Sequence, residues 1–180
     1  MNSSGEHPAG RARPSFLGIY LNDHLAGAGG GVELFRRAAR AHRDDALGPP
    51  LEALAKEVAA DRESLRALMA ALGVPAKRTR MAAGWVAEKA GRLKLNGRLL
   101  SRSPLSDVLE LEAMRLGVEG KAACWRSLRA VARTDPRIES SHIEELIHRA
   151  ERQISTLETI RGNRAAQVFT QGARAGSRPA

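Results

Sequence analysis

The clearest pattern in this 180-residue chain is an apolar stripe whose members recur every three or four positions between residues 51 and 72. This spacing places the side chains on one face of an α-helix, because residues three and four apart lie above one another. The stripe runs Leu51, Leu54, Val58, Asp61, Leu65, Leu68 and Leu72. A buried carboxylate without a partner is costly, so we expect Asp61 to be paired, neutralised or bound to a cation. The sequence therefore predicts a polar site inside a helical core.

Similar periods along the rest of the chain predict further helices and no strand. The expected helices span residues 15–42, 50–72, 77–100, 104–132 and 136–160. Capping residues and prolines mark several starts, as at Ser103-Pro104 and Asp135-Pro136. Residues 1–14 and 161–180 are rich in small residues, Pro and Arg and have no apolar period, so we expect two disordered tails.

A run of glycines interrupts the first predicted helix between Gly27 and Gly31. Each interior glycine costs about 0.5–1 kcal/mol relative to alanine. The run indicates either the close approach of a neighbouring helix or ligand, or a local weak point or kink.

The lengths of the connections predict how the helices are arranged. The first two helices are joined by about seven residues and the last two by about four, which is typical of antiparallel hairpins. The helix predicted at 77–100 would be roughly 36 Å long, enough to return the chain along the first hairpin. The sequence thus predicts an all-α four-helix bundle with a long helical crossover between its second and third helices.

With this layout, residues 15–160 resemble the ferritin-like superfamily. The likeness lies in the order and periodicity of four segments: YLNDHLAG, EVAADRESL, SPLSDVLELE and HIEELIHRAE. The resemblance implies a ferritin-like four-helix bundle, which in its di-iron members holds metal with Glu and Glu-x-x-His ligands.

A Glu-x-x-His motif runs from Glu145 to His148, but its helical phase lies away from the apolar stripe. Other side chains are better placed to face inward, and we take them as the candidate metal ligands: His24, Asp61, Glu112, Glu119 and His142. Two interpretations stay open. These residues either hold iron, manganese or zinc with mixed imidazole and carboxylate ligands, or form polar pairs that satisfy one another in the core.

Positive charge is concentrated in one part of the chain. The net charge is +9, and residues 77–102 carry eight Lys or Arg against the single acid Glu88, a net charge of +7. A candidate basic surface in this segment comprises Arg92, Lys94, Arg98 and Arg102. Such a surface could contact nucleic acid or an anionic membrane. We favour the alternative that these side chains neutralise acidic residues of neighbouring helices.

Other features limit the function classes. A single cysteine, Cys124, excludes an intrachain disulfide and a cysteine-based zinc site within one chain. No apolar run reaches the roughly 20 residues that cross a bilayer, and no signal core is visible, so we expect a cytoplasmic protein. We favour a non-enzymatic binding or structural protein with a degenerate metal site, with a homodimer as one arrangement. The alternatives are a metal-binding protein with oxidase or metal-handling activity and a nucleic-acid-associated bundle.

Overall fold

The computed structural model describes residues 15–77 and 104–176, and every regular element within them is an α-helix. The helices are α1 (Phe16–Ala41), α2 (Gly48–Ala71), α4 (Pro104–Ala132) and α5 (Ser140–Gly176). The helix predicted at 77–100 falls almost entirely outside the described residues. None of the described helices is long and apolar enough to span a membrane.

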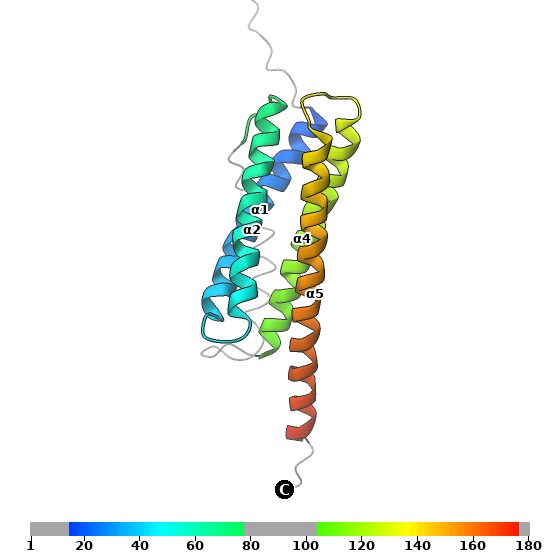
Figure 1. Cartoon of the computed structure of the whole chain (residues 1–180). Coiled ribbons are helices and arrows are strands. Elements are labelled where there is room, and N and C mark those ends of the chain that lie inside the picture. Colours follow the sequence, from blue (N-terminus) through cyan, green and yellow to red (C-terminus); the bar gives the residue numbers. More distant parts are fainter. Residues whose placement is uncertain (1–14, 78–103, 177–180) are drawn as a thin grey trace, which may run out of the picture.

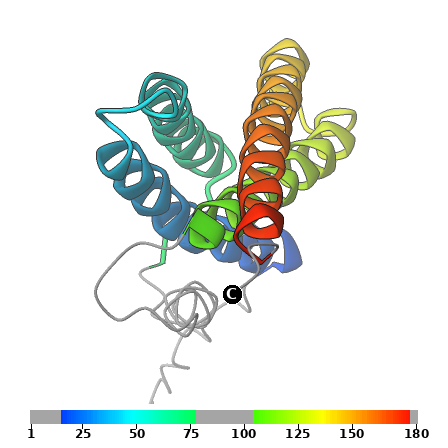
Figure 2. The same cartoon turned by 90° about the horizontal axis from the view of Figure 1, so that it is seen from below.

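The four helices form two hairpins that meet along one side. α1 packs on α2 and α4 packs on α5, while α1 also contacts α4 and joins the hairpins (Figure 1). Figure 2 shows the bundle from one end, with α2 and α5 further apart on the side opposite to this junction. α2 and α4 run in the same direction, because α2 ends and α4 begins at opposite ends of the bundle. The predicted all-α four-helix bundle is confirmed for the described residues.

Local capping explains the boundaries of the first hairpin. The Ser15 hydroxyl accepts a hydrogen bond from Gly18 N at 3.0 Å and begins α1, as the sequence predicts. Two prolines occupy the first turn of α2, where their missing N–H groups cost nothing. Gly73 follows the end of α2, and its φ of 69° allows Val74 N to donate to Met69 O at 2.8 Å. This is a Schellman motif, and only glycine adopts its left-handed position without strain.

The loop before α5 differs from the prediction. The sequence predicts a helix from residue 136, but α5 begins at Ser140. Asp135 does not cap a helix, because its Oδ1 accepts from Arg137 N at 3.1 Å within a turn. Arg137 Nη1 then donates to Leu72 O at 3.2 Å, so the turn satisfies a carbonyl at the end of α2.

The end of α5 also differs from the prediction. Residues 161–176 are helical, where the sequence predicts a disordered tail, and α5 projects beyond the start of α4 (Figure 1). Arg161 pairs with Glu158 one turn earlier at 2.5 Å, which stabilises the helix at this point. Arg164 adds a contact to Asp107 of α4, with 3.1 Å between Nε and Oδ2.

The glycines of α1 are not explained by close packing at three of their positions. A Cβ added at Gly27, Gly29 or Gly31 would meet no atom within 4 Å. α1 nevertheless continues without a break from Phe16 to Ala41. Of the two interpretations, a local weak point in the helix fits these three positions.

Candidate functional site

The buried stripes of α4 and α5 are interrupted by polar side chains at regular positions. With alternating spacings of four and three, the stripe of α4 runs Asp107, Leu111, Met114, Val118, Lys121, Trp125 and Leu128. That of α5 runs Ile143, Leu146, Ala150, Gln153, Leu157, Ile160 and Arg164. The interruptions of the two helices meet in two groups of charged and polar residues. We call them the middle layer (Glu57, Asp61, Lys121, Arg149 and Gln153) and the end layer (Arg37, His42, Asp45, Asp107, Glu110 and Arg164).

The middle layer is centred on Asp61 of α2, which is 1% exposed. The Lys121 ammonium of α4 contacts both Asp61 Oδ2 and Gln153 Oε1. The Gln153 amide, on α5, donates to Glu57 Oε2 at 2.8 Å and to Asp61 Oδ2 at 3.2 Å. Both polar atoms of the Gln153 amide are therefore hydrogen-bonded: the oxygen accepts from the Lys121 ammonium, and the nitrogen donates to two carboxylates.

Arg149 completes the charge balance of the middle layer. Its Nε lies 3.0 Å from Asp61 Oδ1, as an ion pair without hydrogen-bond geometry. The layer thus holds two carboxylates, of Glu57 and Asp61, and two cations, of Lys121 and Arg149. This pairing offsets the cost of taking each charge out of water.

Burial in the middle layer changes the pKa of Lys121. Desolvation lowers its pKa, and this effect exceeds the opposing attraction of Asp61, while the nearby Arg149 lowers the pKa further. Asp61 is therefore the main group that favours the charged form of Lys121.

The middle layer does not fit a metal ion. A divalent cation at Asp61 would meet the positive charges of Lys121 and Arg149. Within residues 15–77 and 104–176, no three His, Cys, Asp or Glu side chains are grouped so that they could hold a metal. The implied iron, manganese or zinc therefore has no suitable ligand set in the described part of the chain.

The structure brings only one of the five candidate ligands into the middle layer, namely Asp61. His24 lies against the Tyr20 ring at a centroid distance of 4.5 Å, and burial lowers its pKa. His142 is half-exposed, 3.8 Å from Glu145. Glu145 and His148 are both exposed, which confirms the orientation expected from their helical phase.

Glu112 and Glu119 do not face the core in the way the sequence predicts. Their side chains are 45% and 40% exposed, and each lies 3.6 Å from an arginine, Arg161 for Glu112 and Arg115 for Glu119. Leu116, which lies on the same side of the helix as Glu112 and Glu119, is 57% exposed. The reason is that α4 carries leucines on two faces, and the buried one is the face of Leu111.

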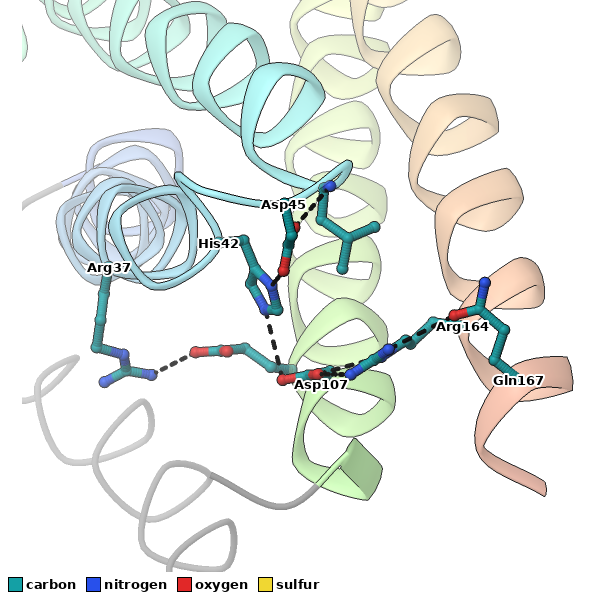
Figure 3. Close-up of polar contacts among 8 residues, drawn as sticks. Arg37, His42, Asp45, Asp107, Arg164 and Gln167 are labelled. Atoms are coloured by element: carbon teal, nitrogen blue, oxygen red, sulfur yellow. Dashed lines mark hydrogen bonds and ion pairs between the residues drawn. The ribbon is translucent and has the colours of Figure 1, made fainter. Parts of the chain in front are cut away.

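The end layer lies where the turn after α1 meets α4 and α5 (Figure 3). The buried His42 has Nδ1 2.7 Å from Asp45 Oδ2 and Nε2 3.4 Å from Asp107 Oδ1. Arg164 of α5 binds Asp107 Oδ2 with Nη2 at 2.5 Å. Next to these residues, Arg37 Nη2 donates to Glu110 Oε1 at 2.8 Å.

Asp45 links the end layer to the start of α2. Its Oδ1 accepts from Leu47 N at 2.8 Å while Oδ2 faces the His42 ring. Desolvation raises the pKa of this carboxyl, but the hydrogen bonds from His42 and Leu47 outweigh it and hold the pKa below its ordinary value. The ionised form of Asp45 is therefore favoured by folding.

Cys124 does not join either layer. Burial raises the pKa of the Cys124 thiol to about 12, which makes it a packing residue and not a nucleophile. The basic candidates Arg92, Lys94, Arg98 and Arg102 lie outside the described residues, so both the favoured neutralisation of acidic residues and the alternative of contact with nucleic acid or a membrane stay open. Comparison with protein-family models, curated proteins and solved structures finds no match to this chain.

Proposed function

We propose that this protein is a non-enzymatic binding or structural protein with a ferritin-like bundle and a degenerate metal site. In this proposal, the cations of Lys121 and Arg149 supply the charge that a metal would supply between carboxylates of the core. The observation that carries it is the contact of the Lys121 ammonium with both Asp61 and Gln153.

The direction of the helices supports the ferritin-like arrangement. α2 and α4 run in the same direction, as expected when two antiparallel hairpins are joined by a long crossover. One long crossover between two antiparallel hairpins is the connection that distinguishes this class of four-helix bundle.

The middle layer would then serve to fix the helices relative to one another. A polar group in an otherwise apolar stripe favours the alignment in which it finds its partners, as single polar residues do in coiled coils. Asp61, Lys121 and Gln153 come from three different helices, so one alignment of α2, α4 and α5 satisfies them together. A well-defined bundle of this kind presents a fixed surface to a partner.

The test is to measure the metal retained per chain after anaerobic loading with Fe(II), Mn(II) or Zn(II) and desalting. We expect the wild type to retain none in stoichiometric amount. The variant Lys121→Glu, which replaces the central cation by a third carboxylate, should gain retention. The matched control is Lys56→Glu on the exposed face of α2, where Lys56 pairs with Glu52 at 2.8 Å.

A wild type that retains about one metal per chain, and loses it on changing Asp61→Asn, would contradict the proposal and support a metalloprotein. If neither the wild type nor Lys121→Glu retains metal, Lys121 does not stand in for one. Urea unfolding of each variant, checked by circular dichroism, establishes that metal was offered to a folded protein.

A further inference from the structure

The two ring nitrogens of His42 face carboxylates from two different parts of the chain. Nδ1 lies 2.7 Å from Asp45 in the turn to α2, and Nε2 lies 3.4 Å from Asp107 in the first turn of α4. His42 is the C-cap residue of α1 and is 6% exposed. A single buried imidazole thus connects three segments of the bundle (Figure 3).

The protonation state of the ring decides whether it can serve both carboxylates. A neutral imidazole carries one N–H and one lone pair, whereas the imidazolium carries two N–H donors. Only the protonated ring can donate toward Asp45 and attract Asp107 at the same time. In the neutral ring, one nitrogen lone pair would face a carboxylate oxygen.

We propose that His42 is a protonation-dependent tie that holds the α1–α2 turn against the start of α4. The protonated ring binds both carboxylates, and its deprotonation releases the turn from one of them. Histidine is suited to this role because its charge changes in the physiological range of pH.

Among residues 15–77 and 104–176, the other charged groups around His42 do not change in that range. Arg164 of α5 holds Asp107, Arg37 of α1 holds Glu110, and both guanidiniums stay protonated. The neighbouring turn residues Arg43 and Asp44 are exposed and pair with each other at 3.1 Å. The buried side of α2 contributes the apolar residue Leu51 next to His42. Within the described part of the chain, a change between mildly acidic and mildly alkaline pH would therefore act on His42 itself.

The direct test is to record the ¹⁵N resonances of the His42 ring by NMR between about pH 5 and about pH 8, the range in which the charge of histidine ordinarily changes. We expect both nitrogens to carry protons at the acidic end and one of them to lose its proton as the pH rises. A ring that stays a single neutral tautomer, or that stays doubly protonated over the whole range, would overturn the proposal. This measurement needs no variant.

Hydrogen exchange tests the structural consequence. After correction for the intrinsic rate, amides of residues 43–48 should exchange about tenfold faster at the alkaline end, as expected when a hydrogen bond to a charged group is lost. His42→Gln, which cannot change its charge, should show no such pH dependence, and the exposed His148→Gln should behave as the wild type. Equal pH dependence of the turn in the wild type and in His42→Gln would overturn the proposal.

Discussion

The middle and end layers are built alike but depend on different cations. In each, polar residues replace apolar ones at stripe positions of α4 and α5 and meet a partner from the first hairpin. Asp61 of the middle layer faces Lys121 and Arg149, while the end layer adds His42 between Asp45 and Asp107. The same arrangement of helices can therefore hold ion pairs of lysine and arginine, or a histidine contact that depends on pH near neutrality.

The layers also differ in what they connect. They lie about 20 Å apart along α4, at 1.5 Å per residue between Asp107 and Lys121. The middle layer joins α2, α4 and α5 through regular helical positions. The end layer includes the turn after α1 and the extended part of α5, and thus holds a loop and a helix end in place. We expect the middle layer to govern global stability and the end layer to govern local opening.

The largest effect should come from removing the central carboxylate. Asp61→Ala should lower the free energy of unfolding by about 3–5 kcal/mol, because it leaves buried cations without their partner. Urea unfolding at neutral pH measures this loss. The exposed Glu63→Ala, two residues away, is the control and should change stability by less than about 0.5 kcal/mol.

A double variant tests whether stability requires the charges of Asp61 and Lys121 or only the volume of their side chains. Asp61→Leu combined with Lys121→Met removes both charges and keeps apolar bulk in the core, so it should recover most of the stability lost in Asp61→Ala. If Asp61→Ala is no more costly than Glu63→Ala, the middle layer does not govern stability and the comparison fails.

The next largest effect should come from the end layer. Asp107→Asn removes the charge that Arg164 and His42 face and should cost about 1.5–3 kcal/mol, the range for hydrogen bonds to charged groups. If His42 is the proposed protonation-dependent tie, the cost should be larger at mildly acidic pH than at mildly alkaline pH. Denaturant unfolding at both pH values checks this, and a cost that does not vary with pH would remove the proposed difference between the layers.

The sequence identifies the middle layer only in part. Asp61 is visible because six aliphatic residues flank it at helical spacing. Gln153 and Lys121 follow the same spacing in their own stripes, but they are masked by competing apolar faces, such as that of Leu116 on α4. Arg149 lies beside its stripe, and its pairing with Asp61 depends on how the helices align. That alignment follows from packing between helices and is not encoded in any one segment.

The end layer is less visible in the sequence, for a different reason. His42, Asp45 and Asp107 lie where helices begin and end, and boundaries are the least certain part of a pattern-based prediction. His42 falls at the last position of the first predicted helix, and Asp107 near the first position of another. Arg164 falls in a segment predicted to be disordered, although its spacing from Ile160 continues the stripe of α5. Extending the stripes of α4 and α5 until their spacing breaks would have identified Asp107 and Arg164.

Acidification should act on the end layer through Asp45. Its folded pKa lies below its unfolded value, near 3.8. Its contribution is therefore complete above the unfolded pKa and is lost as the pH falls through the lower folded pKa. Between about pH 5 and pH 2, the wild type should lose more stability than Asp45→Asn. Thermal unfolding across this range measures the difference, and parallel curves for the two proteins would show that Asp45 is not stabilised by His42.

The smallest effect should come from α1, which contributes to the end layer but not to the middle layer. Gly29→Ala should raise the free energy of unfolding by about 0.5–1 kcal/mol, because the helix gains alanine's propensity and the added Cβ meets no atom within 4 Å. Gly73→Ala is the opposite control, since its φ of 69° strains any other residue. The gain from Gly29→Ala should be the same in the wild type and in Asp61→Ala, as expected for sites that share no partner. If Gly29→Ala raises the free energy of unfolding less in the His42→Gln background than in the Asp61→Ala background, the stability of α1 depends on His42 in the end layer. Such a result would show that α1 is coupled to the end layer and not to the middle layer.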